Sequence, residues 1–241
     1  MAGETVRTEA ICLDVRPWSR TSHVVTWLTP SGRLGTVVRG AVRPKSHFLG
    51  QYDLNYTCDI LYYARAKGEL HALRDCAPVT LREGLRRDYR ALALAGYFRR
   101  LAAELSPSGT EARAWFDLLA ESLDGLGARL AADDGVSALV AFELSALRLA
   151  GLSPDFSGYD RRADWSAFCI ATGTFSAAGG RCVRVSRAVA AYLARGAREA
   201  ENLQIPLDAA RVIGVFYQFH MDCAVDVRRT VLGMICQKQG R

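Results

Sequence analysis

Positive charge without a compensating acid is the strongest chemical signal in this sequence of 241 residues. Residues 15–52 contain no aspartate or glutamate, and their basic residues are Arg16, Arg20, Arg33, Arg39, Arg43 and Lys45. The net charge of the chain is +6, and the remaining basic and acidic residues balance, so this segment carries all of it. Such a surface attracts a polyanion. An ordinary solvated face is the alternative, but the absence of acids favours a binding face.

Aromatic and loop-forming residues lie among these charges, a combination that suits single-stranded nucleic acid. In such sites cations neutralise phosphates while bases stack on aromatic rings. Gly40 permits a turn or a close approach to a phosphate, and Pro44 stiffens the loop that presents Arg43 and Lys45. An ordinary loop without a binding role explains this glycine and this proline equally well. The aromatic residues in or beside the segment are Trp18, Trp27, Phe48, Tyr52 and Tyr56. Of these, we expect Trp27 and Tyr56 to be core residues.

Catalytic candidates are scarce. The sequence has no Walker-type loop, no dinucleotide glycine fingerprint and no His-Glu-x-x-His helix. Its histidines stand apart from cysteines and carboxylates at ligand spacing, and no acidic cluster adjoins the basic segment to hold the metal ions of a nuclease. We therefore expect a protein without enzymatic activity, metal or cofactor.

The sequence also indicates the cellular compartment of the protein. The N-terminal segment "MAGETVRTEA" lacks the apolar core of a secretory signal, and no apolar stretch approaches the roughly 20 residues of a membrane span. The cysteines number seven and are scattered in apolar runs, which fits reduced thiols used as small core residues. We expect a cytoplasmic protein with no membrane partner.

The elements that position the basic segment are predicted to be β-strands. Alternating or β-branched segments occur at about residues 6–15, 22–29, 33–42, 52–63 and 69–76. The stretches "TPSGRL" and "ARAKGEL" supply turns for two hairpins, and a longer basic loop joins the third and fourth strands. Five short strands with this spacing suit a closed barrel of the OB type, which has no exposed edge.

After Pro78 the pattern changes to helical spacing, and Thr80 with Glu83 forms a candidate capping box. Further helices are expected at about residues 110–130, 135–150, 186–200 and 206–236. The predicted fold is therefore α+β. Residues 1–79 form an OB-fold nucleic-acid-binding domain, and residues 80–241 form a mainly α-helical domain with an irregular hairpin insertion at 152–185.

Glu143 lies inside the apolar stripe of the helix predicted at 135–150. A buried carboxylate needs a partner, so we expect an arginine or a backbone donor from a neighbouring helix. This pattern favours an ion pair that specifies the fold over a catalytic acid.

Several segments of the sequence resemble the RecO family of bacterial recombination mediators. The stretch "GTVVRGAVRPKSHF" (35–48) is similar to the family's strand-end motif, in which a glycine-arginine element runs into arginine, proline, lysine and serine. The stretch "FELSALRLAGLSPDF" (142–156) resembles its second hallmark, a Phe-Glu-Leu helix followed by Gly and Pro-Asp. "EAICLDVRPWSRTSHVVTWLTPSGRLG" resembles the first hairpin and "FYQFHMDCAVDVRRTVL" the closing helices, so the resemblance extends nearly end to end.

This resemblance implies a non-enzymatic DNA repair protein of the RecFOR pathway, associated with the nucleoid. Family members bind single- and double-stranded DNA and anneal complementary strands. They contact the C-terminal tail of single-stranded DNA-binding protein and work with RecR to load RecA. By position, Arg39, Arg43 and Lys45 correspond to DNA contacts, with Arg33 as an addition. Arg20 stands where the family often has glutamate, which removes an acid from the basic face.

The hairpin insertion departs from the family at its metal site. Many members carry a Cys-x-x-Cys pair on each arm, a spacing that closes a tetrahedral zinc site. Here Thr172 stands at the partner position of Cys169, and Val185 at that of Cys182. The sequence therefore predicts a degenerate zinc-finger-like hairpin that holds no metal.

The resemblance also implies a docking slot in the helical domain for the acidic, apolar-ended tail of single-stranded DNA-binding protein. Such a tail needs an apolar slot with arginines at its mouth. The candidate arginines are Arg129 and Arg148, beside Leu144, Leu147 and Leu152. Bundle-core leucines and solvated arginines are the alternative.

Two other classes of function stay open. One is an RNA-binding OB module fused to a helical regulatory domain. The other is a nucleic-acid-modifying enzyme, for which the sequence shows no nucleophile or metal cluster. Binding to DNA and to RNA of equal sequence separates the first from a DNA mediator, and a metal-dependent turnover assay tests the second.

Overall fold

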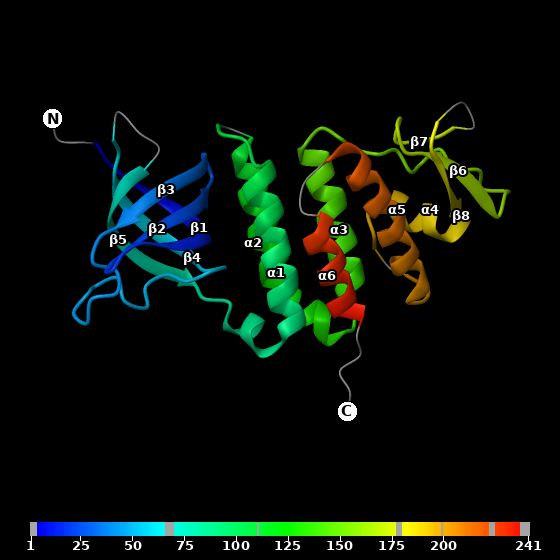
Figure 1. Cartoon of the computed structure of the whole chain (residues 1–241). Helices are drawn as coiled ribbons and strands as arrows, with labels where there is room; N and C mark the ends of the chain where they lie inside the picture. Colours follow the sequence, from blue (N-terminus) through cyan, green and yellow to red (C-terminus); the bar gives the residue numbers. More distant parts are fainter. Residues whose placement is uncertain are drawn as a thin grey trace. The chain divides into compact units, whose positions relative to one another are not determined.

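The computed structural model describes residues 4–65, 70–109, 111–176, 180–198, 200–221 and 225–236 (Figure 1). The chain divides into two compact units. The first joins the chain up to Arg87 with Phe98–Asp124, and the second joins Asp88–Tyr97 with the chain from Gly125 onward. The boundary predicted between residues 79 and 80 concerns a division of function, and it stays a prediction.

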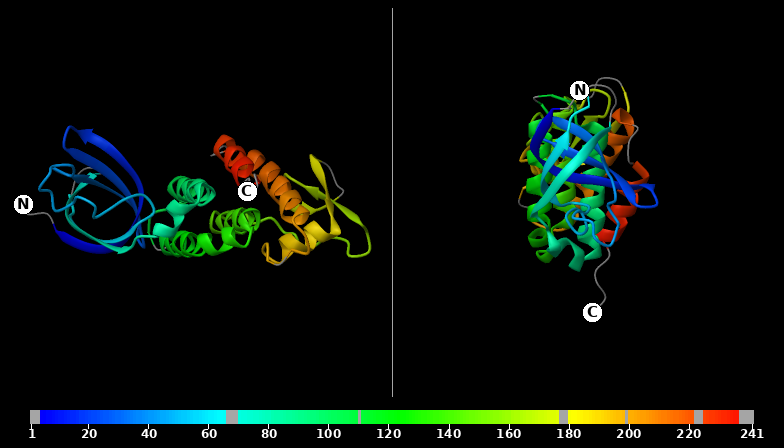
Figure 2. Two further views of the ribbon diagram at one scale, coloured as in Figure 1. Left: turned by 90° about the horizontal axis from the view of Figure 1, so that it is seen from below. Right: turned by 90° about the vertical axis from the view of Figure 1, so that its left-hand side faces the viewer.

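The first unit contains a closed barrel, as the alternating pattern predicts. Its strands are β1 (Thr5–Ser19), β2 (Ser22–Thr29), β3 (Gly32–Val38), β4 (Thr57–Tyr63) and β5 (Leu70–Thr80). They follow the order β1-β2-β3-β5-β4, with β4 returning to pair with β1 and with β3 parallel to β5. Figure 2 shows these strands, in blue and cyan, curving around a common interior. The predicted OB-like barrel is confirmed.

Apolar side chains from alternate strand positions fill the barrel. Trp27 is fully buried, and its indole Nε1 donates a hydrogen bond of 2.8 Å to Thr36 Oγ1, which satisfies the polar edge of the ring inside the core. Tyr56 is buried as predicted, and Phe48 joins it. Cys12 is a free, buried thiol whose pKa is raised by burial, consistent with its expected use as a small core residue.

The connection from the barrel to the first helix differs from the prediction. The capping box is wrong, because Thr80 ends β5 and the first α-helix begins at Tyr89. Between them Arg82 adopts a left-handed backbone conformation, with φ of 51°. Its Nη1 donates to Asn55 O at 2.6 Å and to Thr57 Oγ1 at 2.9 Å. These bonds to the barrel hold the chain out of a helix until residue 83, where a short 3₁₀ turn starts.

The helices otherwise follow the periodicity of the sequence. They are the 3₁₀ turn η1 (Glu83–Arg87), α1 (Tyr89–Leu105), α2 (Ala112–Ala131), α3 (Gly135–Leu149), α4 (Arg187–Ala194), α5 (Gln204–His220) and α6 (Val225–Cys236). The helix predicted at 206–236 is therefore two helices, which lie side by side in Figures 1 and 2. Helix α3 ends at Leu149, and the following Gly151 has φ of 73°, the positive value that the predicted C-cap glycine requires. Among the described helices, none is long and apolar enough to cross a bilayer.

The predicted hairpin insertion is a small antiparallel sheet in the second unit. Its strands are β6 (Trp165–Cys169), β7 (Thr174–Phe175) and β8 (Cys182–Ser186), in the order β7-β6-β8. Phe168 is fully buried, and its ring stacks on Phe156 with centroids 4.7 Å apart. Phe168 also contacts Phe216 of α5, with centroids 6.3 Å apart, so aromatic packing attaches the sheet to a helix of the second unit.

Glu143 is fully buried in the second unit, and its predicted partner is an arginine. Arg228 of α6 donates from Nε to Oε1 at 2.7 Å and from Nη2 to Oε2 at 2.9 Å. Tyr97 Oη donates to the same Oε1 at 2.6 Å, and Arg228 Nη2 also donates to Ala210 O at 2.7 Å. The carboxylate of α3 therefore bonds to α1 and α6, and its arginine partner also bonds to α5, so that both buried charges are satisfied.

Candidate nucleic-acid interface

The loop after β3 is built from consecutive tight turns. Gly40 has φ of 67°, a conformation in which a side chain is strained, and a Cβ there would lie 3.3 Å from Arg43 Cδ. The loop is closed by hydrogen bonds from Arg43 N to Gly40 O at 3.1 Å and from Ser46 N to Arg43 O at 2.9 Å. Val42 N donates to Thr21 O at 3.3 Å, which ties the loop to the β1–β2 turn. Glycine at position 40 thus lets Arg43 fold back along the barrel.

These turns form one wall of a groove of about 720 Å³, called here the basic groove. Its lining residues are Trp18, Ser19, Thr21, Ser22, Val37, Arg39, Gly40, Arg43, Arg65 and Leu70. Arg39, Arg43 and Arg65 line it together, and none of its lining residues in the described part of the chain is acidic. The groove therefore offers three guanidinium groups to an anionic ligand.

The arginines of the basic groove have no acidic partner among the residues that the structure describes. Arg39, Arg43 and Arg65 form no ion pair with any residue that the structure describes, and all three are exposed. By contrast, Arg16 on the same barrel pairs with Asp14 at 2.5 Å. Unpaired guanidinium groups on a concave surface concentrate positive potential where a phosphate chain can reach it.

Trp18 supplies an aromatic surface to the basic groove. It lies at the end of β1, and 63% of its surface is exposed. Trp27, Phe48 and Tyr56 are buried, and the hydroxyl of Tyr52 lies 2.9 Å from His23 Nδ1. Of the aromatic residues singled out in the sequence, Trp18 is therefore the one placed for a base to stack on it beside the arginines.

The four predicted DNA contacts do not lie together. Arg39 and Arg43 line the basic groove, and Lys45 is exposed in the adjoining turns without lining it. Arg33 lies at the opposite end of β3, about 20 Å from Arg39 at roughly 3.3 Å per strand residue. Its Nη1 donates to Ala103 O, at the C-terminal end of α1. Arg33 thus satisfies a helix carbonyl, while Arg39 and Arg43 face solvent.

Sequence reasoning missed Arg65. It lies 13 positions beyond the acid-free segment, and it joins the groove because β3 and β5 pair in parallel with Gly35 opposite Leu70. The stretch "ARAKGEL", predicted as a hairpin turn, carries two basic residues, and this charge is the signal in the sequence that points to Arg65. Another arginine nearby in the chain contacts an aromatic ring, since the Arg74 guanidinium lies 5.4 Å from the centroid of the Tyr63 ring.

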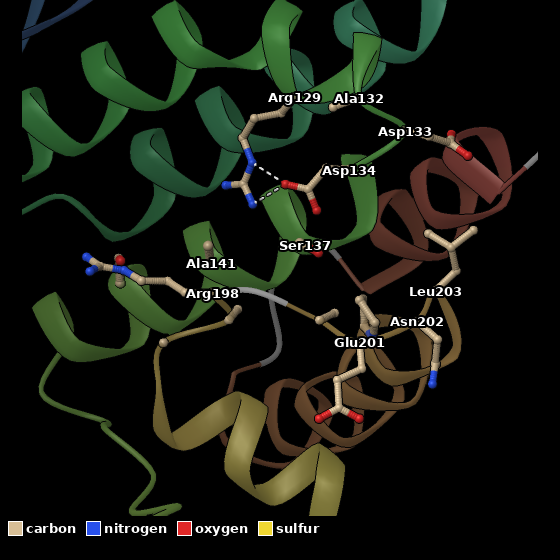
Figure 3. Close-up of a pocket in the computed structure, with 15 residues that line it drawn as sticks. Arg129, Ala132, Asp133, Asp134, Ser137, Ala141, Arg198, Glu201, Asn202 and Leu203 are labelled. Atoms are coloured by element: carbon tan, nitrogen blue, oxygen red, sulfur yellow. Dashed lines mark hydrogen bonds and ion pairs between the residues drawn. The ribbon is translucent and has the colours of Figure 1, made fainter.

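The second unit contains two adjoining hollows where docking residues are predicted. One of about 900 Å³ is lined by Arg129, whose guanidinium bonds twice to Asp134 (Figure 3). The other, of about 280 Å³, is lined by Leu144 and the exposed Arg148. Leu147 is fully buried. Arg148 and Leu144 therefore lie as a docking slot requires, whereas Arg129 is already paired.

The hairpin insertion carries two cysteines at facing positions of neighbouring strands. Cys169 and Cys182 face each other on β6 and β8, while Thr172 and Val185 occupy the positions where further thiolates would be needed. Hydrogen bonds from Thr172 lower the pKa of the Cys169 thiol. Within the described ranges, no three His, Cys, Asp or Glu side chains gather as metal ligands. Two sulfurs do not fit tetrahedral zinc, and the zinc content of the protein stays a prediction.

Comparison with known proteins connects this architecture to one family. The model of the family "Recombination protein O N terminal" matches residues 1–82, which hold the barrel and the basic groove. The model of "Recombination protein O C terminal" matches residues 86–222. Helix α6, which carries Arg228, follows the matched region.

Individual relatives carry the same name. "DNA repair protein RecO" of Roseiflexus sp. (strain RS-1) is 31% identical over 176 residues, which cover 73% of this chain and 60% of that protein. The protein of that name from Geobacter metallireducens is 33% identical over 124 residues, covering 51% and 50%. The one from Anaeromyxobacter dehalogenans (strain 2CP-C) is 33% identical over 152 residues, covering 63% and 59%. The matched region thus spans between half and three fifths of these relatives. With both family models matched in order on a barrel followed by helices, the chain belongs to the RecO family of DNA repair proteins.

Proposed function

We propose that this chain binds single- and double-stranded DNA through the basic groove and anneals complementary strands without acting as an enzyme. The observation that supports this most is that the exposed Arg39, Arg43 and Arg65 line one groove together with the exposed ring of Trp18. Annealing needs no catalytic residue. A basic surface that neutralises the phosphates of two strands lets them approach, and base pairing then supplies the driving force.

Within the RecFOR pathway, the proposed role is to help load RecA onto DNA coated by single-stranded DNA-binding protein, with RecR as a further partner. Membership of a DNA repair family supports this role. We assign DNA binding to residues 1–79 and partner recruitment to residues 80–241, in a protein that works at the nucleoid in the cytoplasm. Lys45 adds a fourth cation at the edge of the groove.

Fluorescence anisotropy with labelled single strands tests the proposal. Replacing Arg39 and Arg43 by Ala should weaken binding on every DNA sequence alike, because phosphates carry no sequence information. The matched control replaces Arg100 and Arg113, two exposed helix arginines of the first unit that already pair with Glu104 and Asp117. This control makes the same change in charge and should leave binding nearly unchanged.

The alternatives are separated by two further measurements. An RNA-binding module would hold RNA of equal sequence as tightly as DNA or more tightly, whereas the proposed mediator holds DNA more tightly. A modifying enzyme would consume labelled DNA or RNA when divalent metal ions are added. We expect no turnover, since the described residues that line the basic groove include no carboxylate to hold a metal ion.

Arg148 provides a test of partner recruitment. We propose that the hollow beside Arg148 and Leu144 receives the acidic, apolar-ended tail of single-stranded DNA-binding protein. Arg148→Ala should weaken binding of the tail peptide by about 10- to 100-fold, since a hydrogen bond to a charged group contributes roughly 1.5–3 kcal/mol. Arg229→Ala, at an exposed position of α6, is the control. Competition of the peptide with DNA for the basic groove would contradict separate surfaces for DNA and partner.

A further inference from the structure

Two cysteines face each other across the small sheet of the second unit. Cys169 ends β6 and Cys182 begins β8, and the strand register pairs them directly. The next pair along, Ile170 and Arg181, is joined by a backbone hydrogen bond of 3.0 Å from Ile170 N to Arg181 O. Because hydrogen-bonded and non-hydrogen-bonded pairs alternate in an antiparallel ladder, the cysteines occupy a non-hydrogen-bonded pair.

That pair type suits a covalent link. Its Cα atoms lie about 4.5 Å apart and its side chains point to the same face of the sheet. A disulfide spans Cα separations of roughly 4.4–6.8 Å. The two thiols lie at directly facing positions of β6 and β8. A bond between the two sulfurs therefore requires no rearrangement of β6 or β8.

We propose that Cys182 and Cys169 form an intramolecular disulfide when the protein meets a peroxide, so that the insertion is a site of reversible oxidation. Cys182 is exposed and Cys169 is fully buried, so the oxidant reaches the Cys182 sulfur first. Its thiolate attacks one oxygen of hydrogen peroxide and breaks the O–O bond, which leaves a sulfenic acid and releases hydroxide. The Cys169 sulfur then attacks the Cys182 sulfur and expels a second hydroxide.

The reaction balances without another reagent. Two thiols and one peroxide give one disulfide and two waters, after the released hydroxides take up the two thiol protons. The two sulfurs together lose two electrons, and the two peroxide oxygens gain them. A dithiol reductant reverses the change by thiol–disulfide exchange, because the Cys182 side of the link is exposed.

A second pair of neighbouring thiols in the barrel provides an internal comparison. The sulfurs of Cys58 and Cys76 each lie 3.6 Å from Gln51 O. Both residues are buried, so neither presents a sulfur to a soluble oxidant. Their register also differs, since Cys58 lies opposite Pro78 and Cys76 opposite Ile60. We expect this pair to stay reduced under conditions that link Cys169 to Cys182.

The test uses the reduced full chain and a small excess of hydrogen peroxide, followed by alkylation under denaturing conditions and peptide mass mapping. The expected product is a peptide pair that joins Cys169 to Cys182, lighter by two hydrogens and absent after dithiothreitol. Cys58 and Cys76 should be found alkylated. Cys236→Ser, at another exposed cysteine, should leave the link unchanged.

Two cysteine variants distinguish the roles of the two sulfurs. In Cys169→Ser, the sulfenic acid on Cys182 has no resolving partner, so dimedone should label it strongly, whereas wild type is labelled little. Cys182→Ser changes an exposed position and should abolish the link while Cys169 stays unoxidised. The proposal is overturned if Cys182 of the wild type proceeds to sulfinic acid without a link. It is equally overturned if Cys182 links to Cys236 or to a second chain instead.

Discussion

Arg228 occupies space in the second unit that only a glycine leaves open. A Cβ at Gly214 would lie 2.5 Å from Arg228 Nη1, closer than a side-chain carbon can approach. The guanidinium cannot move aside, because two bonds to Glu143 and one to Ala210 O hold it. Leaving the buried carboxylate without this partner would cost several kcal/mol. The ion pair between Arg228 and Glu143 therefore requires a glycine at position 214 of α5.

Gly214→Ala should lower the free energy of unfolding by about 1–3 kcal/mol, the usual cost of overpacking a filled core. The measurement is urea denaturation followed by circular dichroism. Gly233→Ala is the matched control, since a Cβ at that position of α6 meets nothing within 4 Å. This control should raise stability by about 0.5–1 kcal/mol, because alanine favours a helix interior. Equal effects of the two substitutions would show that Arg228 is free to shift.

At the scale of elements, alanine substitutions at Gly40 and Gly50 distinguish the effect of backbone strain from the effect of displacing the Arg43 side chain. Both adopt positive φ in the loop after β3, at 67° and 77°, so alanine is strained at either position. A Cβ at Gly40 would contact the Arg43 side chain, whereas one at Gly50 meets nothing within 4 Å. Both substitutions should cost about 1–2 kcal/mol of stability. Only Gly40→Ala should also weaken DNA binding, as measured by anisotropy at a temperature where both variants are folded.

The small sheet β7-β6-β8 should hold together without zinc. Its buried contacts are aromatic, and the described part of the insertion supplies two sulfurs where a tetrahedral site needs four ligands. Elemental analysis of the purified protein after mild chelation should therefore find well under one zinc per chain. One zinc per chain would mean that other residues complete the ligand set.

The sequence predicts individual elements better than their pairing. Strand β2 is predicted because Val24, Val25 and Thr26 are β-branched, and Gly151 follows α3 because the C-cap needs positive φ. The capping box predicted at Thr80 is wrong, because β5 continues to Thr80 and the bonds of Arg82 to the barrel decide where the helix begins. No local pattern reveals the bond from Arg33 to Ala103 O, which depends on where α1 ends relative to β3.

The residues of the candidate site are likewise predictable from the sequence only in part. Arg39 and Arg43 are predicted because they follow a strand in an acid-free segment. Arg65 is not, because the parallel pairing of β3 with β5 brings it into the groove. A partner for Glu143 is predicted from its place in an apolar stripe, but its identity as Arg228 depends on the packing of several helices.

At the scale of the whole molecule, charge distribution carries the central claim. The chain has a net charge of +6, all of which falls in residues 15–52. The fold places Arg39 and Arg43 of this segment with Arg65 in the basic groove and leaves Lys45 exposed beside them. If each of these four neutralises one phosphate, binding to single strands must depend on salt through release of counterions.

The slope of log affinity against log salt concentration tests this account most directly. For single-stranded DNA it should be about −2.8 in the wild type, at roughly −0.7 per phosphate contact. Replacing Arg39 and Arg43 by Ala should bring it to about −1.4 and weaken binding, while the control with Arg100 and Arg113 replaced should keep the wild-type slope. A slope that is unchanged by loss of Arg39 and Arg43, or reduced equally by the control, would contradict DNA binding through the basic groove.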